Sequence, residues 1–358
     1  MIRVVITGTG ALAPRGISTL TRVHGEVTTG GEVDMPACDD RHERIANTAI
    51  DAALAEAKLA ASDAGFVWGT GLDNYQQRDG GLQHVPTGIV FTTLARRFAV
   101  PRRMIGFACA TGTAAIGEAF RLVRSNRARV CVAGGSSTML GPFYVAGFHA
   151  LRAVAIDDPS EPASAACKPF DRKRRGFALS DGAAALVVES LASAHARGAE
   201  PLAEIVGYGV SQDAFDLNRP PPDGAGALLA MQRAIADAHL EASDVHAVNA
   251  HGTGTHAGDI AEAAAIRALF GHARTPVSSL KGAIGHTMAA AGALESLAAI
   301  ATCRTGIVPP TTNLDDPDDA CALDHVIGAP RETGATRVLK TSFGMGGQNA
   351  ALVIQRFA

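Results

Sequence analysis

Residues 106–113, Gly-Phe-Ala-Cys-Ala-Thr-Gly-Thr, join a short apolar run to a segment with helical spacing at Thr113–Arg124. This junction predicts that Cys109 lies in a tight strand-to-helix turn, where small neighbours expose the thiol. The amino terminus of the helix would stabilise the thiolate and lower the cysteine pKa below its free value of about 8.5. Cys109 is therefore a candidate nucleophile, although a lone cysteine is more often a small buried hydrophobe.

The alternation of strand and helix continues along the chain and predicts an α/β fold. Short β-branched runs ending in glycine or serine are separated by alanine-rich stretches with helical spacing, which is typical of a parallel sheet covered by helices. The expected strands are Val4–Ile6, Phe66–Trp68, Arg129–Ala133, Ala185–Glu189, Ala203–Gly207, Ala247–Asn249, Val277–Ser279, Val338–Ser342 and Ala351–Gln355. The expected helices are Ile45–Ala57, Thr113–Arg124, Ala225–His239, Asp259–Phe270 and Thr287–Arg304.

A weak similarity in the order of strands and glycine-rich turns between the two parts of the chain indicates an internal duplication. Each part opens with a strand and closes with glycine-rich turns after β runs, and the segment from Ala196 to Pro201 breaks a helix before a new strand. We therefore expect two halves, residues 1–199 and residues 200–358, with Cys109 in the first.

Composition excludes several classes of protein. The 358 residues include 35 acidic and 32 basic ones, a net charge of −3, which argues against a nucleic-acid-binding protein. The six cysteines form no C-x-x-C pair, so a reducing compartment fits best. The apolar run Val4–Ile6 is shorter than the core of a secretory signal, and Met288–Cys303 is too short for a bilayer span and contains Glu295. We expect a cytoplasmic protein with no membrane span.

Three further motifs carry weaker signals. Gly8–Ala13 imitates the start of a dinucleotide-binding turn, but Pro14 and Gly16 follow where that motif needs a helix. Ser278–Lys281 has the serine-x-x-lysine spacing of some acylating hydrolases without their companion motifs. His251 and His256 are five positions apart, with two glycines between them, so they share no ligating face. No acidic residue stands at a motif position either, and no metal site is expected.

Basic residues occur in short groups at Arg96-Arg97 and Arg172–Arg175. The simplest interpretation is a solvated surface. The alternative is that four basic residues lie near the mouth of the active-site pocket that would contain Cys109 and bind an acidic partner protein. These residues are Arg96, Arg97, Arg172 and Lys173.

Two histidine motifs accompany the cysteine. His251-Gly-Thr-Gly-Thr255 follows the expected strand Ala247–Asn249, and Lys281-Gly-Ala-Ile-Gly-His286 follows Val277–Ser279. Because strand ends gather at one crevice in such sheets, Cys109, His251 and His286 can meet there. One thiol and two imidazoles suit chemistry on a thioester, in which the cysteine accepts an acyl group and the imidazoles donate to an oxygen that gains negative charge. A hydrolase would need only one histidine.

These motifs together resemble the elongating β-ketoacyl-acyl carrier protein synthases of the thiolase-like superfamily. The resemblance is nearly continuous from residue 106 onward. It is carried by Gly106–Glu118, His251–Thr255, Lys281–Gly292 and Ser342–Asn349, with further matches at Pro169–Gly182, Pro222–Gly224 and Val308–Leu314. It implies a duplicated, five-layered α-β-α-β-α fold and a homodimer or a dimer with a related subunit.

The resemblance also implies a role for each residue. Cys109 would take an acyl chain from the phosphopantetheine of an acyl carrier protein, and His251 and His286 would hold the enolate formed when malonyl-carrier protein loses carbon dioxide. Lys281, paired with Glu262, would fix the charge and orientation of His286. The backbone N–H groups of Cys109 and Met345 would form an oxyanion hole, and Thr253, Thr255 and Phe343 would contact the pantetheine arm. No resident cofactor is implied.

The chain also departs from the family pattern. It is shorter before Phe107, where Gly16–His42 corresponds to a reduced amino-terminal helix and loop, and Met345 stands where phenylalanine is usual. The function that the resemblance favours is decarboxylative condensation in fatty acid or polyketide synthesis. An accessory subunit resembling a chain-length factor, which usually lacks the nucleophile, and a thioester hydrolase are the alternatives.

Overall fold

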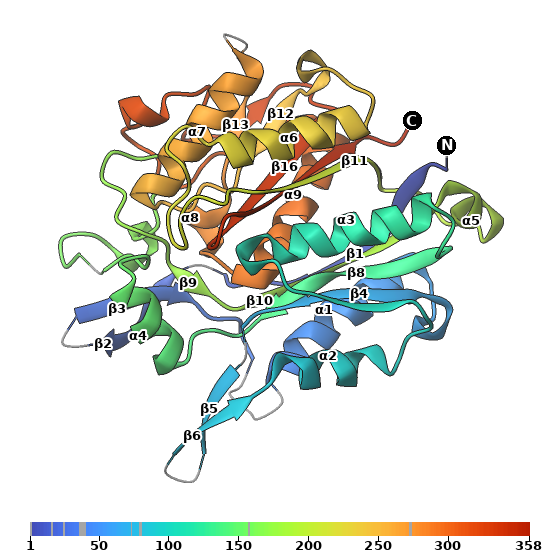
Figure 1. Ribbon diagram of the computed structural model, residues 1–358, viewed down its shortest axis with the longest axis horizontal. Coiled ribbons are helices and arrows are strands. Elements are labelled where there is room, and N and C mark those ends of the chain that lie inside the picture. The colour runs from blue at the N-terminus through green and yellow to red at the C-terminus, as the bar shows by residue number, and fades with distance from the viewer. Residues whose placement is uncertain are drawn as a thin grey trace.

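The computed structural model describes residues 2–15, 17–23, 26–35, 41–72, 74–78, 81–156, 158–271 and 274–358. Its centre is a ten-stranded sheet that runs through the whole molecule (Figure 1). In spatial order the strands are β13 (Val277–Ser278), β12 (Ala247–Asn249), β16 (Arg337–Gly344), β17 (Gln348–Gln355), β11 (Ala203–Gln212), β1 (Val4–Leu12), β10 (Gly182–Ser190), β8 (Val130–Ser137), β4 (Gly65–Thr70) and β7 (Arg102–Ile105).

The sheet is mixed rather than parallel. Outward from β1, the pairings β1–β10 and β10–β8 are antiparallel, and β8–β4 and β4–β7 are parallel. Outward from β11, β17 and β16 are again joined by antiparallel pairings, and β12 and β13 by parallel ones. The predicted parallel sheet is therefore only partly parallel, and its direction was not predictable because a strand buried on both faces has the same apolar composition in either direction. The repeated series of pairings is the pattern that a duplicated unit would give.

Helices and sheet alternate in five layers (Figure 1). Helices α1 (Arg41–Ala57) and α2 (Thr87–Ala95) cover one outer face, α6 (Ala225–Asp237) and α7 (His256–Phe270) cover the other, and α3 (Thr111–Arg124) and α9 (Ala291–Thr305) lie between the two parts of the sheet. Successive side chains of a strand point to opposite faces. In β10, Leu186 therefore packs in the central core and Val187 in the outer core beside α1. The fold is the predicted α-β-α-β-α arrangement.

The two central helices cross where each has a glycine. A Cβ on Gly112 of α3 would lie 2.8 Å from the backbone nitrogen of Ala293, and one on Gly292 of α9 would lie 2.6 Å from that of Thr113. Each helix follows a short 3₁₀ turn whose first residue has a positive φ, 44° at Ala108 and 49° at Met288. This crossing places the turn with Cys109 beside the turn that follows His286.

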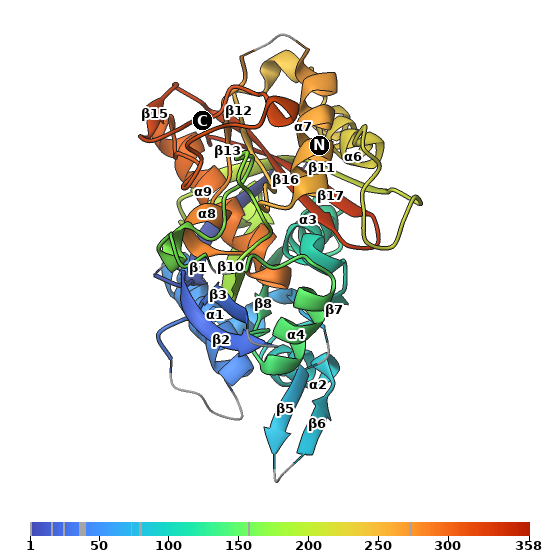
Figure 2. The ribbon, with the colours of Figure 1, turned by 90° about the vertical axis from the view of Figure 1, so that its left-hand side faces the viewer.

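The remaining elements surround this body. The helices are α4 (Pro142–Ala150), α5 (Leu191–Ala196) and α8 (Lys281–Ile284); the strands are β2 (Ser18–Val23), β3 (Glu26–Gly31), β9 (Leu179–Ser180), β14 (Ile307–Val308) and β15 (Arg331–Glu332). Strands β5 (Asn74–Arg78) and β6 (Gly81–Val85) form a hairpin that projects from the body (Figure 2). Strands β2 and β3 occupy much of Gly16–His42, where we expected a reduced helix and loop; residues 16, 24, 25 and 36–40 of that stretch lie outside the described residues.

Candidate active site

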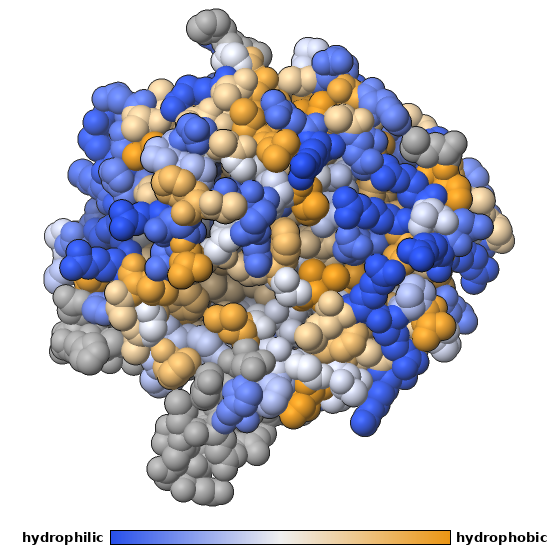
Figure 3. Space-filling view, viewed as in Figure 1, coloured by the Kyte–Doolittle hydropathy of each residue, from blue (hydrophilic) through white to orange (hydrophobic). Residues whose placement is uncertain are grey.

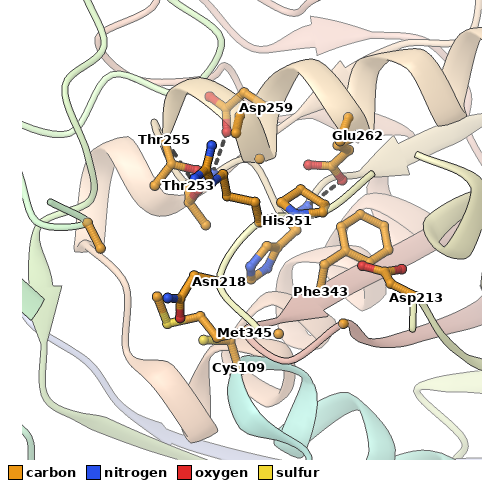
Figure 4. Close-up of a pocket in the computed structure, with 18 of the residues that line it drawn as sticks. Cys109, Asp213, Asn218, His251, Thr253, Thr255, Asp259, Glu262, Phe343 and Met345 are labelled. Carbon is orange, nitrogen blue, oxygen red and sulfur yellow. Dashed lines mark hydrogen bonds between the residues drawn. The ribbon is translucent and has the colours of Figure 1, made fainter. Parts of the chain in front are cut away.

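A cavity of about 620 Å³ brings the predicted residues of both halves together. Its lining includes Cys109 from the turn before α3, His251 after β12, and His286 after α8, together with Phe343 and Met345 beside the turn between β16 and β17 (Figure 4). The predicted meeting of one thiol and two imidazoles is therefore present. Figure 3 shows the surface above these elements as a mosaic of polar and apolar residues with a hollow near its centre.

Cys109 lies in a sharply defined turn. The backbone N–H of Phe107 donates to Thr111 Oγ1 (2.7 Å), and that hydroxyl donates to the carbonyl of Ala108 (2.6 Å). Cys109 is only 6% exposed, and this burial raises the pKa of its thiol to about 11. The Lys281 charge and the backbone N–H groups of Met345 and Cys109 act in the opposite direction and are outweighed. The prediction of a lowered pKa is therefore wrong, because loss of solvation exceeds the favourable charges.

The two histidines present a matched pair of rings. The centroids of His251 and His286 are 5.3 Å apart, with the planes nearly perpendicular. Lys281 Nζ lies 3.2 Å from His251 Nδ1, and the backbone N–H of Met288 donates to His286 Nδ1 (3.3 Å). An ammonium and a backbone N–H are donors only, so both Nδ1 atoms are acceptors. Burial, followed by the Lys281 charge, lowers both histidine pKa values well below 6.5. Both rings are thus neutral, with the proton on Nε2.

Lys281 is held by a different carboxylate from the one predicted. Its Nζ donates to the His251 carbonyl (2.6 Å) and forms a buried ion pair with Glu295 of α9. Glu262 instead accepts from the backbone N–H groups of His251 (2.8 Å) and Gly252 (2.7 Å). The predicted Lys281–Glu262 pair is therefore wrong. Lys281 contacts His251 rather than His286, although its charge still lowers the pKa of His286, whose charge and orientation it was predicted to fix. The signal for Glu295 was present in the sequence, since it is a carboxylate within an otherwise apolar helix.

A third buried carboxylate fixes the loop that carries the threonines. Asp259 of α7 accepts from the backbone N–H groups of Thr253 (3.0 Å) and Gly254 (3.2 Å), as Figure 4 shows in part. The hydroxyls of Thr253 and Thr255 are 2.8 Å apart, and both residues line the cavity. They are therefore available to a polar chain inside it.

The glycine-rich turn closes the cavity beside the thiol. A Cβ on Gly344 would lie 3.1 Å from the backbone nitrogen of Cys109, so the two backbones are in close contact. Phe343 packs its ring edge-on to His251 at 5.8 Å. The backbone N–H groups of Met345 and Cys109 both act to lower the pKa of the Cys109 thiol, although burial outweighs them.

Different arginines from those predicted line the cavity. Arg152 and Arg219 do so, together with Asn218, Pro220 and Pro221 of the loop before α6. None of the four predicted docking residues lines it. Arg97 is ion-paired with Asp51 on the outer helix α1, and Arg172 with Asp316 (3.2 Å) and Asp319 (3.2 Å). Residue type alone could not separate the two sets, since both consist of exposed basic residues.

The described residues contain neither a cluster of metal ligands nor a membrane-spanning helix. Within the described ranges, no group of three or more His, Cys, Asp or Glu residues could hold a metal ion. No helix in the same ranges is long and apolar enough to cross a bilayer.

Comparisons with known proteins agree with this geometry. Family models described as beta-ketoacyl synthase, N-terminal domain and beta-ketoacyl synthase, C-terminal domain match residues 35–194 and 202–315. The chain is 36% identical to 3-oxoacyl-[acyl-carrier-protein] synthase 2 of Staphylococcus aureus (strain MRSA252) over 413 residues, covering 99% of both chains. It is 34% identical to the synthase of the same name from Rhizobium meliloti (strain 1021), covering 100% of this chain and 99% of the relative.

Solved structures give the same result. A type II PKS acyl-carrier protein in complex with its ketosynthase (AntDE:AntF) matches with a TM-score of 0.90 and 26% identity, and a beta-ketoacyl synthase from Burkholderia phymatum STM815 with 0.88 and 29%, each over 100% of both chains. The chain belongs to the beta-ketoacyl synthase family. This confirms the predicted family, its thiolase-like fold and the class of enzyme, a condensing acyltransferase. An alignment of 413 residues against a chain of 358 also confirms that the chain is short.

Proposed function

We propose that this chain condenses a Cys109-bound acyl group with malonyl-acyl carrier protein. The observation that carries the proposal is the tautomer of the two histidines. Because Nδ1 of each ring accepts a hydrogen bond, Nε2 of each is a neutral N–H donor. Two such donors lining one cavity with a thiol are suited to an oxygen that becomes negatively charged.

In the first stage Cys109 would exchange with the thioester of an incoming acyl chain. Its sulfur attacks the acyl carbonyl, the carbon–sulfur bond to pantetheine breaks, and the thiol proton goes to the departing pantetheine sulfur. Burial keeps the resting thiol protonated. Its proton therefore has to pass directly to the departing pantetheine sulfur, because Nε2 of His251 and of His286 already carries a proton and Nδ1 of each already accepts a hydrogen bond. The N–H groups of Cys109 and Met345 would stabilise the tetrahedral oxyanion.

In the second stage malonyl-carrier protein would lose carbon dioxide. The electrons of the broken carbon–carbon bond form an enolate, whose oxygen accepts from Nε2–H of His251 and His286. The enolate carbon then attacks the acyl-cysteine carbonyl, the Cys109 thiolate leaves, and one proton from water restores the thiol. Lys281 and Glu295 act behind His251 by fixing its tautomer, since Lys281 can only donate to Nδ1.

The pantetheine arm would arrive with an acyl carrier protein, so the chain would need no resident cofactor. Thr253, Thr255 and Phe343 line the cavity and are proposed to contact that arm. Arg152 and Arg219 add positive charge to the same lining. The docking role of Arg96, Arg97, Arg172 and Lys173 stays a prediction, and charge reversal at Arg172 with carrier affinity measured against salt tests it.

We further propose that two such subunits pair along β7. This strand is bonded to β4 and ends the ten-stranded sheet, which leaves an edge suited to pairing. Met104 of this strand is 49% exposed, and Val100, two residues before the strand begins, is 80% exposed. A solved ketosynthase/chain length factor is among the similar structures. Analytical sedimentation of the purified chain tests this pairing. Wild type should sediment as a homodimer, and Met104→Asp, which places a charge on β7, should sediment as a monomer.

Two assignments from the sequence remain proposals. We retain the division into residues 1–199 and 200–358, which the repeated series of strand pairings supports. A cytoplasmic location is supported by the free cysteines at five described positions, which suit a reducing compartment.

Release of carbon dioxide from malonyl-acyl carrier protein tests the central proposal. Wild type should release it, and His286→Ala should reduce the rate by at least about 100-fold, since one donor to the enolate is lost. Intact-protein mass spectrometry should show an acyl group on Cys109, absent in Cys109→Ser. An accessory subunit would show neither product, and a thioester hydrolase would yield free acid without a carbon–carbon bond.

A further inference from the structure

A second buried lysine lies behind the catalytic residues and has no part in the reaction proposed above. Lys340 is in the middle of β16, 0% exposed and among the largest fully buried side chains. A lysine at such depth is unfavourable unless its ammonium is paired and hydrogen-bonded. Its contacts therefore indicate why the fold retains it.

The ammonium of Lys340 shares one carboxylate with Lys281. Lys340 Nζ lies 2.8 Å from Glu295 Oε2 as an ion pair, while Lys281 Nζ bonds the other oxygen, Glu295 Oε1. Lys340 also donates to Ser342 Oγ (3.1 Å) and to the backbone carbonyl of Thr341. Glu295 is thus held from both sides, and only one of its two lysines contacts His251.

The contacts continue to the helix that follows the nucleophile. Ser342 and Lys340 lie on the same face of β16, two residues apart. Ser342 Oγ is 2.7 Å from Thr113 Oγ1, and both residues are fully buried. Thr113 is in the first turn of α3, four residues after Cys109. A single buried series of polar contacts therefore joins α8, α9, β16 and α3.

The charges in this region balance only when Lys340 is counted. The ammonium groups of Lys281 and Lys340 are both paired with Glu295. The carboxylate of Glu262, which accepts from Thr341 on the opposite face of β16, acts on Lys340 through its charge. His251 and His286 are neutral. Without Lys340, two buried carboxylates would face one ammonium, which favours protonation of the neighbouring groups.

We infer that Lys340 is a positioning residue of this active site: it holds Glu295 so that Lys281 keeps His251 in the neutral, Nε2-protonated form. The inference rests on the proposed function for its kinetic consequence but not for its geometry. The charge of Lys340 also contributes to the lowered pKa of both histidines. Removing it should therefore raise those values.

The test compares Lys340→Met, which keeps the length of the side chain but not the charge, with Leu339→Met. Leu339 is its fully buried neighbour on the other face of β16 and is the matched control. For malonyl-acyl carrier protein decarboxylation by Lys340→Met, we expect kcat to fall about tenfold or more with little change in KM. The acidic limb of its pH profile should move up by about half a pH unit or more. Leu339→Met should match wild type, and Lys340→Arg should recover the wild-type limb.

Circular dichroism melting establishes that each variant is folded. If Lys340→Met does not fold, Lys340→Gln takes its place, because a glutamine can still form hydrogen bonds with Ser342 and the Thr341 carbonyl. A neutral variant with a wild-type kcat and pH profile, or an equal loss in Leu339→Met, would overturn the inference. Titration of His251 by NMR in histidine-labelled protein separates the two proposals. If wild type does not decarboxylate malonyl-carrier protein, the proposed function fails, whereas a raised His251 pKa in the variant would still support the role of Lys340.

Discussion

Glu295, rather than Glu262, should be energetically coupled to Lys281. The perturbations are Lys281→Met, Glu295→Gln and the double variant, with Glu262→Gln in place of Glu295→Gln as the matched comparison. Lys281 and Glu295 are each 1% exposed at the side chain. Glu295→Gln leaves two buried ammonium groups, those of Lys281 and Lys340, without their carboxylate, which costs about 3–5 kcal/mol of the free energy of unfolding. Lys281→Met should cost less, because Glu295 keeps its ion pair with Lys340.

The double variant removes both charges of this pair and leaves Lys340 without its carboxylate, as Glu295→Gln alone also does, so its loss should be smaller than the sum of the single losses. We expect a coupling energy of about 2 kcal/mol or more for Lys281 with Glu295. For Lys281 with Glu262 it should be below about 0.5 kcal/mol, because Glu262 is bonded to the backbone at His251 and Gly252. Urea unfolding at one fixed protein concentration, followed by circular dichroism, measures all four corners of each cycle. Equal coupling in the two cycles would refute the assignment of Glu295.

Three further outcomes are expected. Burial lowers the pKa of His42 to about 4; since the unfolded value is about 6.5, the unfolded state binds the proton first and stability falls as pH drops. The stability of wild type relative to His42→Gln should thus decrease by about 2 kcal/mol between pH 7 and pH 5, and a pH-independent difference would contradict it. Gly112→Ala places a Cβ 2.8 Å from the Ala293 nitrogen and should cost about 1–3 kcal/mol in chemical unfolding, whereas Gly147→Ala, with nothing within 4 Å, should be neutral or stabilising. Alkylation of Cys109 by iodoacetamide should rise about tenfold per pH unit up to its pKa of about 11, as read by mass spectrometry; a plateau near pH 7 would show a stabilised thiolate instead.

Sequence patterns predicted the parts of this fold that depend on local periodicity. The strand Ala247–Asn249 has the predicted bounds, and α1 contains the predicted stretch Ile45–Ala57. Strand direction was not predictable, because it depends on which neighbour a strand meets rather than on its own residues. The edge strand β7 was missed because it is short and half-exposed, with two arginines in four residues.

The site shows the same division. Cys109, His251, His286 and Lys281 follow from motif and spacing, since each stands beside glycine or another small residue at the end of a strand or turn. The partners of Lys281 do not follow from spacing, because Glu295 and Lys340 come from other elements and meet it only through packing. The pKa of Cys109 likewise depends on the desolvation that the surrounding layers produce, which no single stretch of sequence reports.

The matching positive φ angles at Ala108 and Met288 show that the same turn is used in both halves of the protein, with a different contribution to the active site in each. One backbone shape, built twice, carries a thiol at its second residue in the first half and Ala289 in the second. The second turn contributes no reactive side chain, yet the backbone N–H of its first residue, Met288, fixes the tautomer of His286 by donating to Nδ1. Equivalent turns in the two halves thus serve different purposes, since one presents a sulfur and the other orients an imidazole.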